Sequence, residues 1–340
     1  MARLVIAASR IWVKPGVVLD DAEVVCEDGV VLRVGQAAPA DDADRLEVDG
    51  FVMPAAADRH VHIGLSDPWP VLAGGVTAVR DLGWPANLIF PLAELSDGPA
   101  FEGPLIRAAG PMLTAPGGYP TQASWAPEGT AVEVATPADG AAAVHRLAGL
   151  GAAAIKVALN AEVGPTPDDA TLVAIVDAAD ALGVPVTAHA QGSGQVERAL
   201  GAGIHELAHT PWIQLGDDLI EQAARRIRIV STLDMTSFGR DTPNLRAAID
   251  NLRRFLAAGG DVVYGTDLGN GSIPPGIHVR ELTLLRESGL DPDGVLAALT
   301  RAPLEPGAPA DLIALAADPL EDFGAFERIA AVIRAGRRII

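Results

Sequence analysis

Two histidines separated by one residue, His60 and His62, follow an apolar segment that ends at Asp58. In an extended strand, residues two positions apart point to the same face, so the two imidazoles would lie side by side. Such a pair can bind a metal ion, but two histidines at a strand end can equally be hydrogen-bonded packing residues. The pair alone leaves both interpretations open, and the rest of the chain has to decide between them.

Four further residues that can bind a metal, or can become able to, lie at the ends of predicted strands: Lys156, His189, His209 and Asp267. Taken singly, each has a structural explanation, as a core histidine, a helix N-cap or a salt-bridged lysine. Buried polar groups without a shared purpose would each need separate hydrogen-bond partners. Their occurrence at equivalent places in successive units therefore favours one shared metal site.

Lysine is almost absent from the chain, because only Lys14 and Lys156 among its 25 basic residues are not arginine. Arginine stays protonated, whereas a buried lysine can lose its proton and react as a neutral amine. The bias indicates a chemical role for Lys156. Among the other histidines, we expect His145 and His205 to be structural. We predict that His278 is a candidate contact to substrate.

Between residues 51 and 303, short apolar strands alternate with alanine-rich amphipathic helices. We predict strands over residues 51–58, 77–81, 105–109, 153–158, 185–190, 204–209, 227–232 and 262–266. We predict helices over residues 137–150, 168–182, 194–200, 217–226, 245–258 and 277–288. Eight such strands are typical of an α/β fold of the (β/α)8 TIM barrel type, with catalytic groups at the carboxyl ends of the strands, although a doubly wound sheet has the same periodicity.

The two ends of the chain contain short strands and tight turns instead. We predict strands over residues 4–6, 11–13, 22–26, 30–34 and 45–48 near the N-terminus, and over residues 311–315 and 330–334 near the C-terminus. Because chain ends often lie together, we expect residues 1–50 and 304–340 to form one small β-sandwich-like domain beside a barrel of residues 51–303. A long loop rich in Gly and Pro, from Ala115 through Gly129, is typical of a functional lid.

The composition excludes several classes of function. The chain has 340 residues, of which 49% are hydrophobic and 20% charged, as in a soluble globular protein with a sizeable core. Its formal charge of −19 argues against nucleic acid and against an anionic membrane as partners. Cys26 is the single cysteine, the N-terminal apolar run is too short for a signal peptide, and no run could span a membrane. We expect a cytoplasmic protein that acts on a small molecule. The sequence leaves open whether the protein forms a homo-oligomer.

With these residues in place, the sequence resembles the amidohydrolase superfamily. The resemblance covers nearly the whole chain and extends beyond the six metal-binding residues. The further motifs resemble those of the imidazolonepropionase-like branch, which includes Xaa-Pro dipeptidases (prolidases). They are residues 75–83 (GVTAVRDLG), 103–110 (GPLIRAAG), 116–118 (PGG), 265–267 (GTD) and 307–312 (GAPADL).

The resemblance implies a barrel that holds two divalent metal ions, which we expect to be zinc, bridged by a carboxylated Lys156. One metal would bind His60, His62, the Lys156 carbamate and Asp267, and the other would bind the carbamate, His189 and His209. A neutral lysine amine can add carbon dioxide to give such an oxygen ligand, which arginine cannot. A hydroxide shared by the metals would attack the substrate, with Asp267 as the catalytic residue that accepts its proton and returns it to the leaving nitrogen.

The predicted reaction is hydrolysis of an amide C–N bond in a peptide-like substrate, an N-acyl amino acid or a cyclic amide. A lactonase or esterase on the same binuclear site is the alternative. A deaminase is disfavoured because deaminases of the superfamily carry a glutamate three residues after the fifth-strand histidine, where this chain has Gly192. A catalytically inactive scaffold is disfavoured because such proteins usually lose metal ligands, and this chain has all six.

Three positions depart from the family pattern. Residues 54–58 are Pro-Ala-Ala-Ala-Asp where relatives have Pro-Gly-apolar-Ile-Asp, Tyr119 stands where many relatives have His, and residues 300–307 shorten the usual helix and turn. We predict Tyr119, Arg240 and His278 as substrate-binding residues. The other candidates in the loops are Trp84, Trp125, Phe238 and Asn270. Arg240 could bind a substrate carboxylate or pair with Asp241 at the surface, and the sequence leaves both open.

Overall fold

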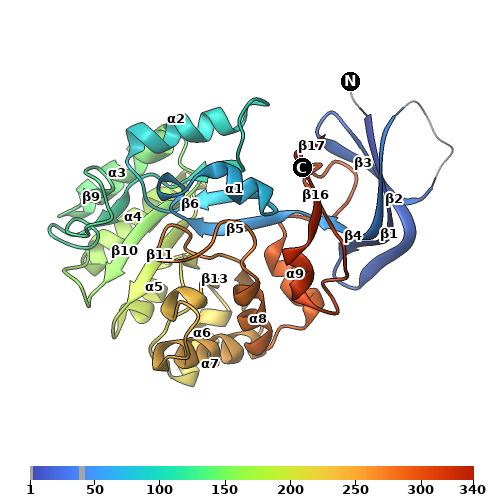
Figure 1. Cartoon of the computed structure of the whole chain (residues 1–340). Helices are drawn as coiled ribbons and strands as arrows, with labels where there is room; N and C mark the ends of the chain where they lie inside the picture. The colour runs from blue at the N-terminus through green and yellow to red at the C-terminus, as the bar shows by residue number, and fades with distance from the viewer. Residues whose placement is uncertain (1–2, 38–42) are drawn as a thin grey trace.

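The computed structural model describes residues 3–37 and 43–340, so residues 1, 2 and 38–42 of the predicted terminal domain lie outside the described residues. Parallel strands and helices alternate through the middle of the chain, and a separate sheet contains strands from both chain ends (Figure 1). The α/β class predicted from the sequence is confirmed.

Strands from both chain ends form one seven-stranded sheet in the order β17-β16-β15-β4-β1-β2-β3. Its strands are β1 (Arg3–Lys14), β2 (Val17–Glu27), β3 (Val30–Gln36), β4 (Asp44–Pro54), β15 (Leu312–Leu315), β16 (Ile329–Arg334) and β17 (Arg337–Arg338). The ends meet in the antiparallel pair of β4 and β15, in which Met53 lies opposite Ile313. In Figure 1 the blue N-terminal strands and the red C-terminal strands accordingly lie side by side.

Strand β1 is longer than the sequence predicts. We expect two short strands there, at residues 4–6 and 11–13, but the structure has one continuous strand. Strand β2 pairs with it on one side and β4 on the other. Pairing along both edges outweighs the weak strand propensity of the residues in between, and a register shift between Ala8 and Arg10 accommodates them.

Two parallel sheets carry the predicted β/α units, in the orders β5-β6-β7 and β14-β13-β12-β11-β10-β8-β9. Their strands are β5 (Ala56–Val61), β6 (Val76–Asp81), β7 (Leu105–Ala108), β8 (Met112–Thr114), β9 (Ala131–Glu133), β10 (Ile155–Asn160), β11 (Val186–Gln191), β12 (Glu206–Leu207), β13 (Arg228–Val230) and β14 (Asp261–Val263). The predicted third strand, residues 105–109, corresponds to β7, and β8 follows it after Gly110, which has φ +76°, a conformation that glycine adopts without strain. As a result β7 pairs with β6, and β8 pairs with β10.

Backbone hydrogen bonds connect the two parallel sheets at both of their junctions. Beside β5, the amide of Asp267 donates to the carbonyl of His60 at 2.8 Å, and the amide of His62 donates to the carbonyl of Leu268 at 2.7 Å. Beside β7, the amide of Ala153 donates to the carbonyl of Ala108 at 2.8 Å. The carboxyl end of β5 therefore lies directly beside the segment that follows β14.

Helices follow most of the parallel strands. The helices expected from the sequence correspond to α3 (Pro137–Gly149), α4 (Asp169–Ala181), α5 (Gln195–Ala202), α6 (Asp217–Ala224), α7 (Pro243–Ala257) and α8 (Val279–Glu287). Side chains cap some of them, as Thr136 and Thr242 do just before a proline at the first helical position. We did not predict α1 (Pro68–Ala73), α2 (Ala86–Ser96) or α9 (Pro292–Leu299). Prolines obscure these helices, and α2 even contains Pro91 in its interior.

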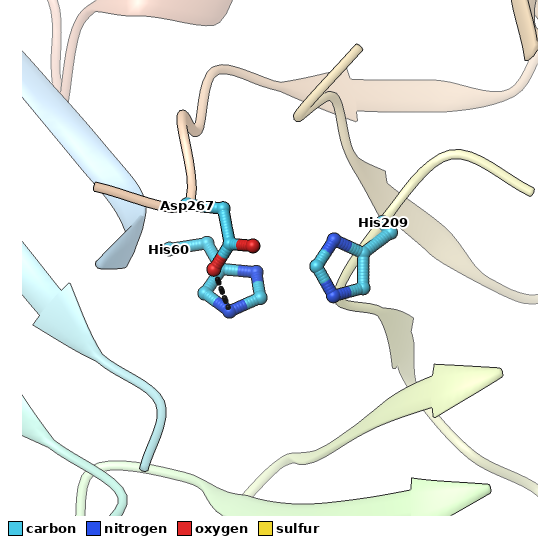
Figure 2. A group of neighbouring side chains, drawn as sticks. All are labelled: His60, His209 and Asp267. Carbon is cyan, nitrogen blue, oxygen red and sulfur yellow. Dashed lines mark ion pairs between the residues drawn. The ribbon is translucent and has the colours of Figure 1, made fainter. Parts of the chain in front are cut away.

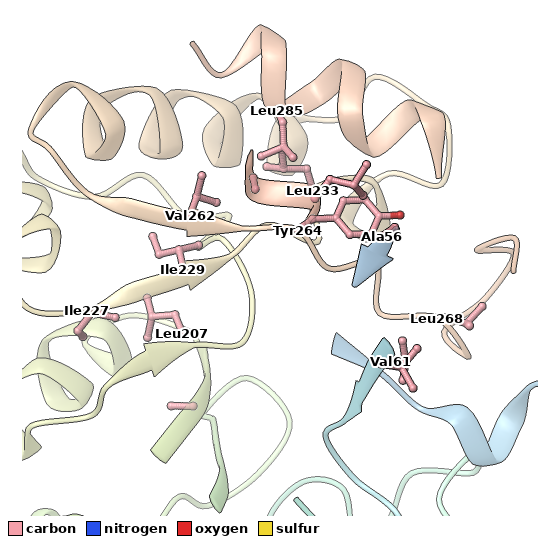
Figure 3. Packing of buried hydrophobic residues seen from close by; sticks show 14 of the residues in the cluster. Ala56, Val61, Leu207, Ile227, Ile229, Leu233, Val262, Tyr264, Leu268 and Leu285 are labelled. Carbon is pink, nitrogen blue, oxygen red and sulfur yellow. The ribbon is translucent and has the colours of Figure 1, made fainter. Parts of the chain in front are cut away.

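A large apolar cluster fills the space between the parallel strands and the helices. Leu207, Ile229 and Val262 lie opposite one another on β12, β13 and β14 and form one row across the sheet. Figure 3 shows this row together with Tyr264 and Leu285, which belong to the same cluster. No helix in the described part of the chain has the length and apolarity needed to cross a bilayer.

A second apolar cluster joins the two chain ends and can be tested through its cysteine. Cys26 on β2 and Ile333 on β16 both belong to this cluster. Burial raises the pKa of the Cys26 thiol to about 12, so a thiol reagent should reach a reactive thiolate only when the cluster opens. We predict that Ile333→Ala, which should cost about 2–5 kcal/mol of stability, accelerates Cys26 labelling at about pH 8.

Leu32→Ala is the matched control, because Leu32 lies on β3 in the same sheet but is 41% exposed. Its labelling rate should stay close to that of the wild type. Equal rates for Ile333→Ala and Leu32→Ala would show that the chain ends do not share one core.

Candidate metal centre

All six predicted metal-binding residues are buried and come from parallel strands or from the loops after them. Lys156 is the second residue of β10 rather than its last, so its four-carbon stem has to extend toward the carboxyl end of the strand. Because parallel strands end at the same edge, the six side chains gather there. Among the described residues, ligand atoms of His60, His209 and Asp267 all lie within 4.8 Å of one another (Figure 2).

Two buried carboxylates hold the backbone of the site in position. Asp58 accepts hydrogen bonds from the amides of His60 at 3.0 Å and Thr266 at 3.1 Å, and so ties β5 to the segment after β14. Asp81, at the end of β6, accepts from the amide of Ile63 at 2.8 Å. These bonds fix the strand ends from which the candidate ligands project.

Backbone carbonyls determine which ring nitrogen carries the hydrogen in His60 and His62. Nδ1 of His60 lies 2.7 Å from the carbonyl oxygen of Ala208, and Nδ1 of His62 lies 3.2 Å from that of Gly83. A carbonyl oxygen only accepts, so Nδ1 carries the hydrogen in both rings and Nε2 keeps a lone pair. Both Nε2 atoms face Oδ1 of Asp267, at 3.2 Å and 3.3 Å.

Three acceptor atoms therefore face one another in the centre of the site. Oδ1 of Asp267 is buried and has no hydrogen-bond partner among the described residues, while its Oδ2 accepts from Asn270 at 2.9 Å. Converging lone pairs repel in a buried site unless a proton or a metal cation lies between them. Burial lowers the pKa of His62, but the Asp267 carboxylate outweighs burial and raises it, which shows that positive charge is favoured between these atoms. This donor set fits a metal ion.

A second pair of ring nitrogens meets beside this group. Nδ1 of His189 lies 2.9 Å from Nε2 of His209. Two nitrogens that bind one tetrahedral zinc at about 2.0–2.1 Å are about 3.3 Å apart, so this pair is close to the geometry of shared coordination. Burial, together with the charge of Lys156, lowers the pKa of His189 to about 4. The ring is therefore neutral near pH 7 and has a lone pair to offer.

Lys156 is the remaining candidate ligand, and it acts electrostatically on both groups of ligands. Its side chain is completely buried, and its Nζ has no hydrogen-bond partner in residues 3–37 and 43–340. After burial, its charge is the largest influence that lowers the pKa of both His60 and His189. Burial lowers the pKa of Lys156 itself to about 7, so much of the amine is neutral near that pH. A neutral amine in this position fits a lysine that becomes a carbamate.

Three aromatic rings lie against the histidines. The ring of Trp125 is 4.8 Å from that of His62, and the ring of Tyr119 is 5.3 Å from that of His189, measured between centroids. Both residues come from the long loop that follows β8, so the predicted lid reaches the site. Trp212, in the loop after β12, lies 6.1 Å from His189 and was not predicted. Its position in the loop that also contains His209 was the signal that could have predicted it.

The other two predicted substrate contacts, Arg240 and His278, belong to a separate network around the buried Asp234. Nε2 of His278 and Nε of Arg280 each lie 2.8 Å from a carboxylate oxygen of Asp234. Arg240 is exposed and donates from Nε to the carbonyl of Ser237 at 3.3 Å. The structure thus brings Tyr119 to the histidines and places Arg240 and His278 in a neighbouring group.

Two other sequence expectations concern ion pairs away from the histidines. We considered Asp241 as a surface partner of Arg240, but Asp241 pairs with Arg246 at 2.6 Å. His205, which we expected to be structural, pairs with Asp180 at 3.0 Å.

Solved structures of known proteins resemble this chain over almost its full length. A candidate prolidase from Bifidobacterium longum has a TM-score of 0.85 and 26% identity, covering 99% of this chain and 94% of that one. A Xaa-Pro dipeptidase with bound methionine has a TM-score of 0.84 and 20% identity, covering 99% of both chains. Ochratoxinase from A. niger has a TM-score of 0.84 and 20% identity, covering 99% of this chain and 95% of that one.

No family model matches the sequence, and no curated protein matches it either. The structural neighbours nevertheless include prolidases and an amidohydrolase. The Bifidobacterium longum protein is 26% identical in sequence to this chain. The resemblance predicted from the sequence is confirmed: the structural neighbours of this chain are prolidase-like proteins of the amidohydrolase superfamily.

Proposed function

We propose that this chain is a metal-dependent hydrolase that cleaves an amide C–N bond with a pair of divalent ions. The observation that carries the proposal is the convergence of buried ligand atoms without partners. Lys156 Nζ and Asp267 Oδ1 have no hydrogen-bond partner among the described residues. The Nε2 atoms of His60 and His62 face Asp267 Oδ1, and ring nitrogens of His189 and His209 meet at 2.9 Å. Buried polar atoms are rarely left unpaired in the absence of a function or a bound ion.

The proposal includes a closed (β/α)8 barrel over residues 51–303. The hydrogen bonds between the two parallel sheets, from Asp267 to His60 and from Ala153 to Ala108, support closure into one ring. Residues 1–50 and 304–340 would form the small β-sandwich-like domain, which the pairing of β4 with β15 supports. A cytoplasmic location and a homo-oligomer remain predictions.

The chain offers ligands for two ions. His60, His62 and Asp267 would hold one, His189 and His209 would hold the other, and a carbamate on Lys156 would give an oxygen to each. Divalent ions held here, which we expect to be zinc, would polarise a substrate carbonyl and lower the pKa of a bound water.

Asp267 is the residue that we propose moves the proton. Its Oδ2 is held by Asn270 at 2.9 Å, which leaves Oδ1 pointing into the centre of the site. Oδ1 would accept the proton of the attacking water and deliver it to the leaving nitrogen of the amide. The carboxylate is only 3% exposed, so bulk water does not compete for this proton.

The aromatic rings indicate the kind of substrate. Tyr119, Trp125 and Trp212 give the site apolar walls, which suit a flat or apolar group beside the scissile amide. The Xaa-Pro dipeptidase and ochratoxinase structures support a substrate of the amide class. Arg240 and His278 remain proposed contacts for a substrate carboxylate, although His278 is already paired with Asp234. A lactone or ester would use the same residues.

Asp267→Asn separates metal binding from chemistry. An amide cannot accept and return a proton, so we predict that this variant keeps at least one zinc per chain and loses about 10²–10⁴-fold in turnover. Elemental analysis and a hydrolysis assay measure the two effects.

Asp250→Asn is the control, because Asp250 is a solvent-accessible carboxylate that accepts from Gln214. Turnover of Asp267→Asn close to that of the wild type would show that Asp267 is not the general base.

A substrate panel tests the class of bond that is cleaved. We predict that dipeptides, N-acyl amino acids or lactams are hydrolysed faster than lactones, and that Trp125→Ala raises KM about 2–10-fold through loss of aromatic contact. Trp69→Ala is the control because Trp69 is 40% exposed on α1.

Arg240→Ala in the same panel tests whether Arg240 binds a carboxylate, since only acidic substrates should then lose affinity. Activity confined to uncharged lactones, and indifferent to both Trp125 and Arg240, would contradict the amide proposal and favour the lactonase alternative.

A further inference from the structure

A chain of hydrogen bonds leads from the protein surface to His189. The exposed Glu162 accepts from Nε2 of Gln191 at 2.7 Å, and Oε1 of Gln191 lies 2.8 Å from Nε2 of His189. The amide nitrogen of Asn160 donates to the same Oε1 at 2.9 Å and lies 3.3 Å from Nε2 of His189. Gln191 and Asn160 are the last residues of the neighbouring strands β11 and β10 and lie opposite each other. The relay is therefore built on paired strand ends.

The carboxylate of Glu162 fixes the direction of every bond in this relay. A carboxylate only accepts, so the amide nitrogen of Gln191 has to face Glu162 and its carbonyl oxygen has to face His189. That oxygen also only accepts, and at 2.8 Å it lies closer to Nε2 of His189 than the amide nitrogen of Asn160 does at 3.3 Å. Nε2 of His189 therefore carries the ring hydrogen. Nδ1 of His189 is then left with its lone pair, 2.9 Å from Nε2 of His209.

His189 differs from His60 and His62 in what fixes its ring. The Nδ1 atoms of His60 and His62 are held by backbone carbonyls, which no substitution removes. The Nε2 atom of His189 is held by the side chain of Gln191, whose own orientation depends on Glu162. Among these three histidines, His189 is therefore the one whose tautomer side-chain substitutions can change.

We propose that Gln191 and Glu162 are positioning residues that hold His189 as the Nε2–H tautomer and so present its Nδ1 lone pair to the second metal. This inference rests on the proposed function, because it assigns a task in the binuclear site. Outer partners that orient a metal-binding histidine typically contribute about 10–100-fold to metal affinity. Without Glu162, the amide of Gln191 could rotate and turn its NH2 group toward His189, which would favour the wrong tautomer.

Four variants test the relay through zinc affinity, measured by competition with a chelator. Gln191→Leu and Glu162→Leu should weaken the second equivalent of zinc about 10–100-fold and spare the first. The exchange Gln191→Glu with Glu162→Gln should restore affinity, because the new glutamine would donate to the new carboxylate, which would still accept from His189. Gln191→Glu alone places two carboxylates side by side and should not restore it.

Gln214→Leu is the matched control, since Gln214 also donates to a carboxylate, that of Asp250, at 2.8 Å but outside the metal site. Its zinc affinity should equal that of the wild type. Should Gln191→Leu fail to fold, Glu162→Leu and the exchanged pair still decide the question. Wild-type affinity in Glu162→Leu, or no recovery in the exchanged pair, would overturn the proposal.

The tautomer itself gives a second readout that needs no metal. Long-range 1H–15N spectra of the metal-free protein should show the hydrogen of His189 on Nε2 in the wild type and partly on Nδ1 in Glu162→Leu. The signal is assigned by its absence from His189→Gln. A wild-type hydrogen on Nδ1 would contradict the relay, whereas binding of fewer than two zinc ions with the tautomer as expected would contradict the proposed function alone.

Discussion

The amine of Lys156 and Oδ1 of Asp267 are buried polar atoms without hydrogen-bond partners among the described residues, and the surrounding structure keeps them so. Each such atom costs roughly 1–3 kcal/mol in a folded protein, and a buried charge costs more. The cost could be relieved by small movements, but the carboxylates of Asp58 and Asp81 hold the strand ends and prevent them. A site held in this way is ready for cations, whose binding free energy offsets the cost of the metal-free state.

The terminal sheet contributes to this rigidity. Strand β4 ends at Pro54 in the terminal sheet, and β5, which carries His60, begins at Ala56. The amide of Ala55 between them donates to the carbonyl of Asp311 at 2.9 Å, so the C-terminal part of the chain holds the junction. The first pair of histidines therefore projects from a strand that is anchored in both sheets. The relay from Glu162 gives His189 a comparable support through side-chain hydrogen bonds.

The sequence predicts well those features that repeat along the chain. The candidate ligands occur in successive β/α units, so strand periodicity was enough to find them, although Lys156 lies at the start of its strand rather than at the end. Predictions of features that depend on contacts between distant segments were absent or wrong. The short strands at residues 4–6 and 11–13 are one strand because neighbours pair on both sides. The roles of Gln191 and Glu162 follow from the pairing of β10 with β11, which no local pattern reveals.

The central claim is that Lys156 joins two metal ions within one buried site. Anomalous diffraction at the zinc edge, from crystals of the zinc-loaded protein grown with bicarbonate, tests it most directly. The account predicts two anomalous peaks, one beside His60 and Asp267 and one beside His189 and His209, with continuous electron density for a carbamate extending from Nζ of Lys156 toward both. A single peak, or a bare amine at Lys156 beside two ions, would contradict it.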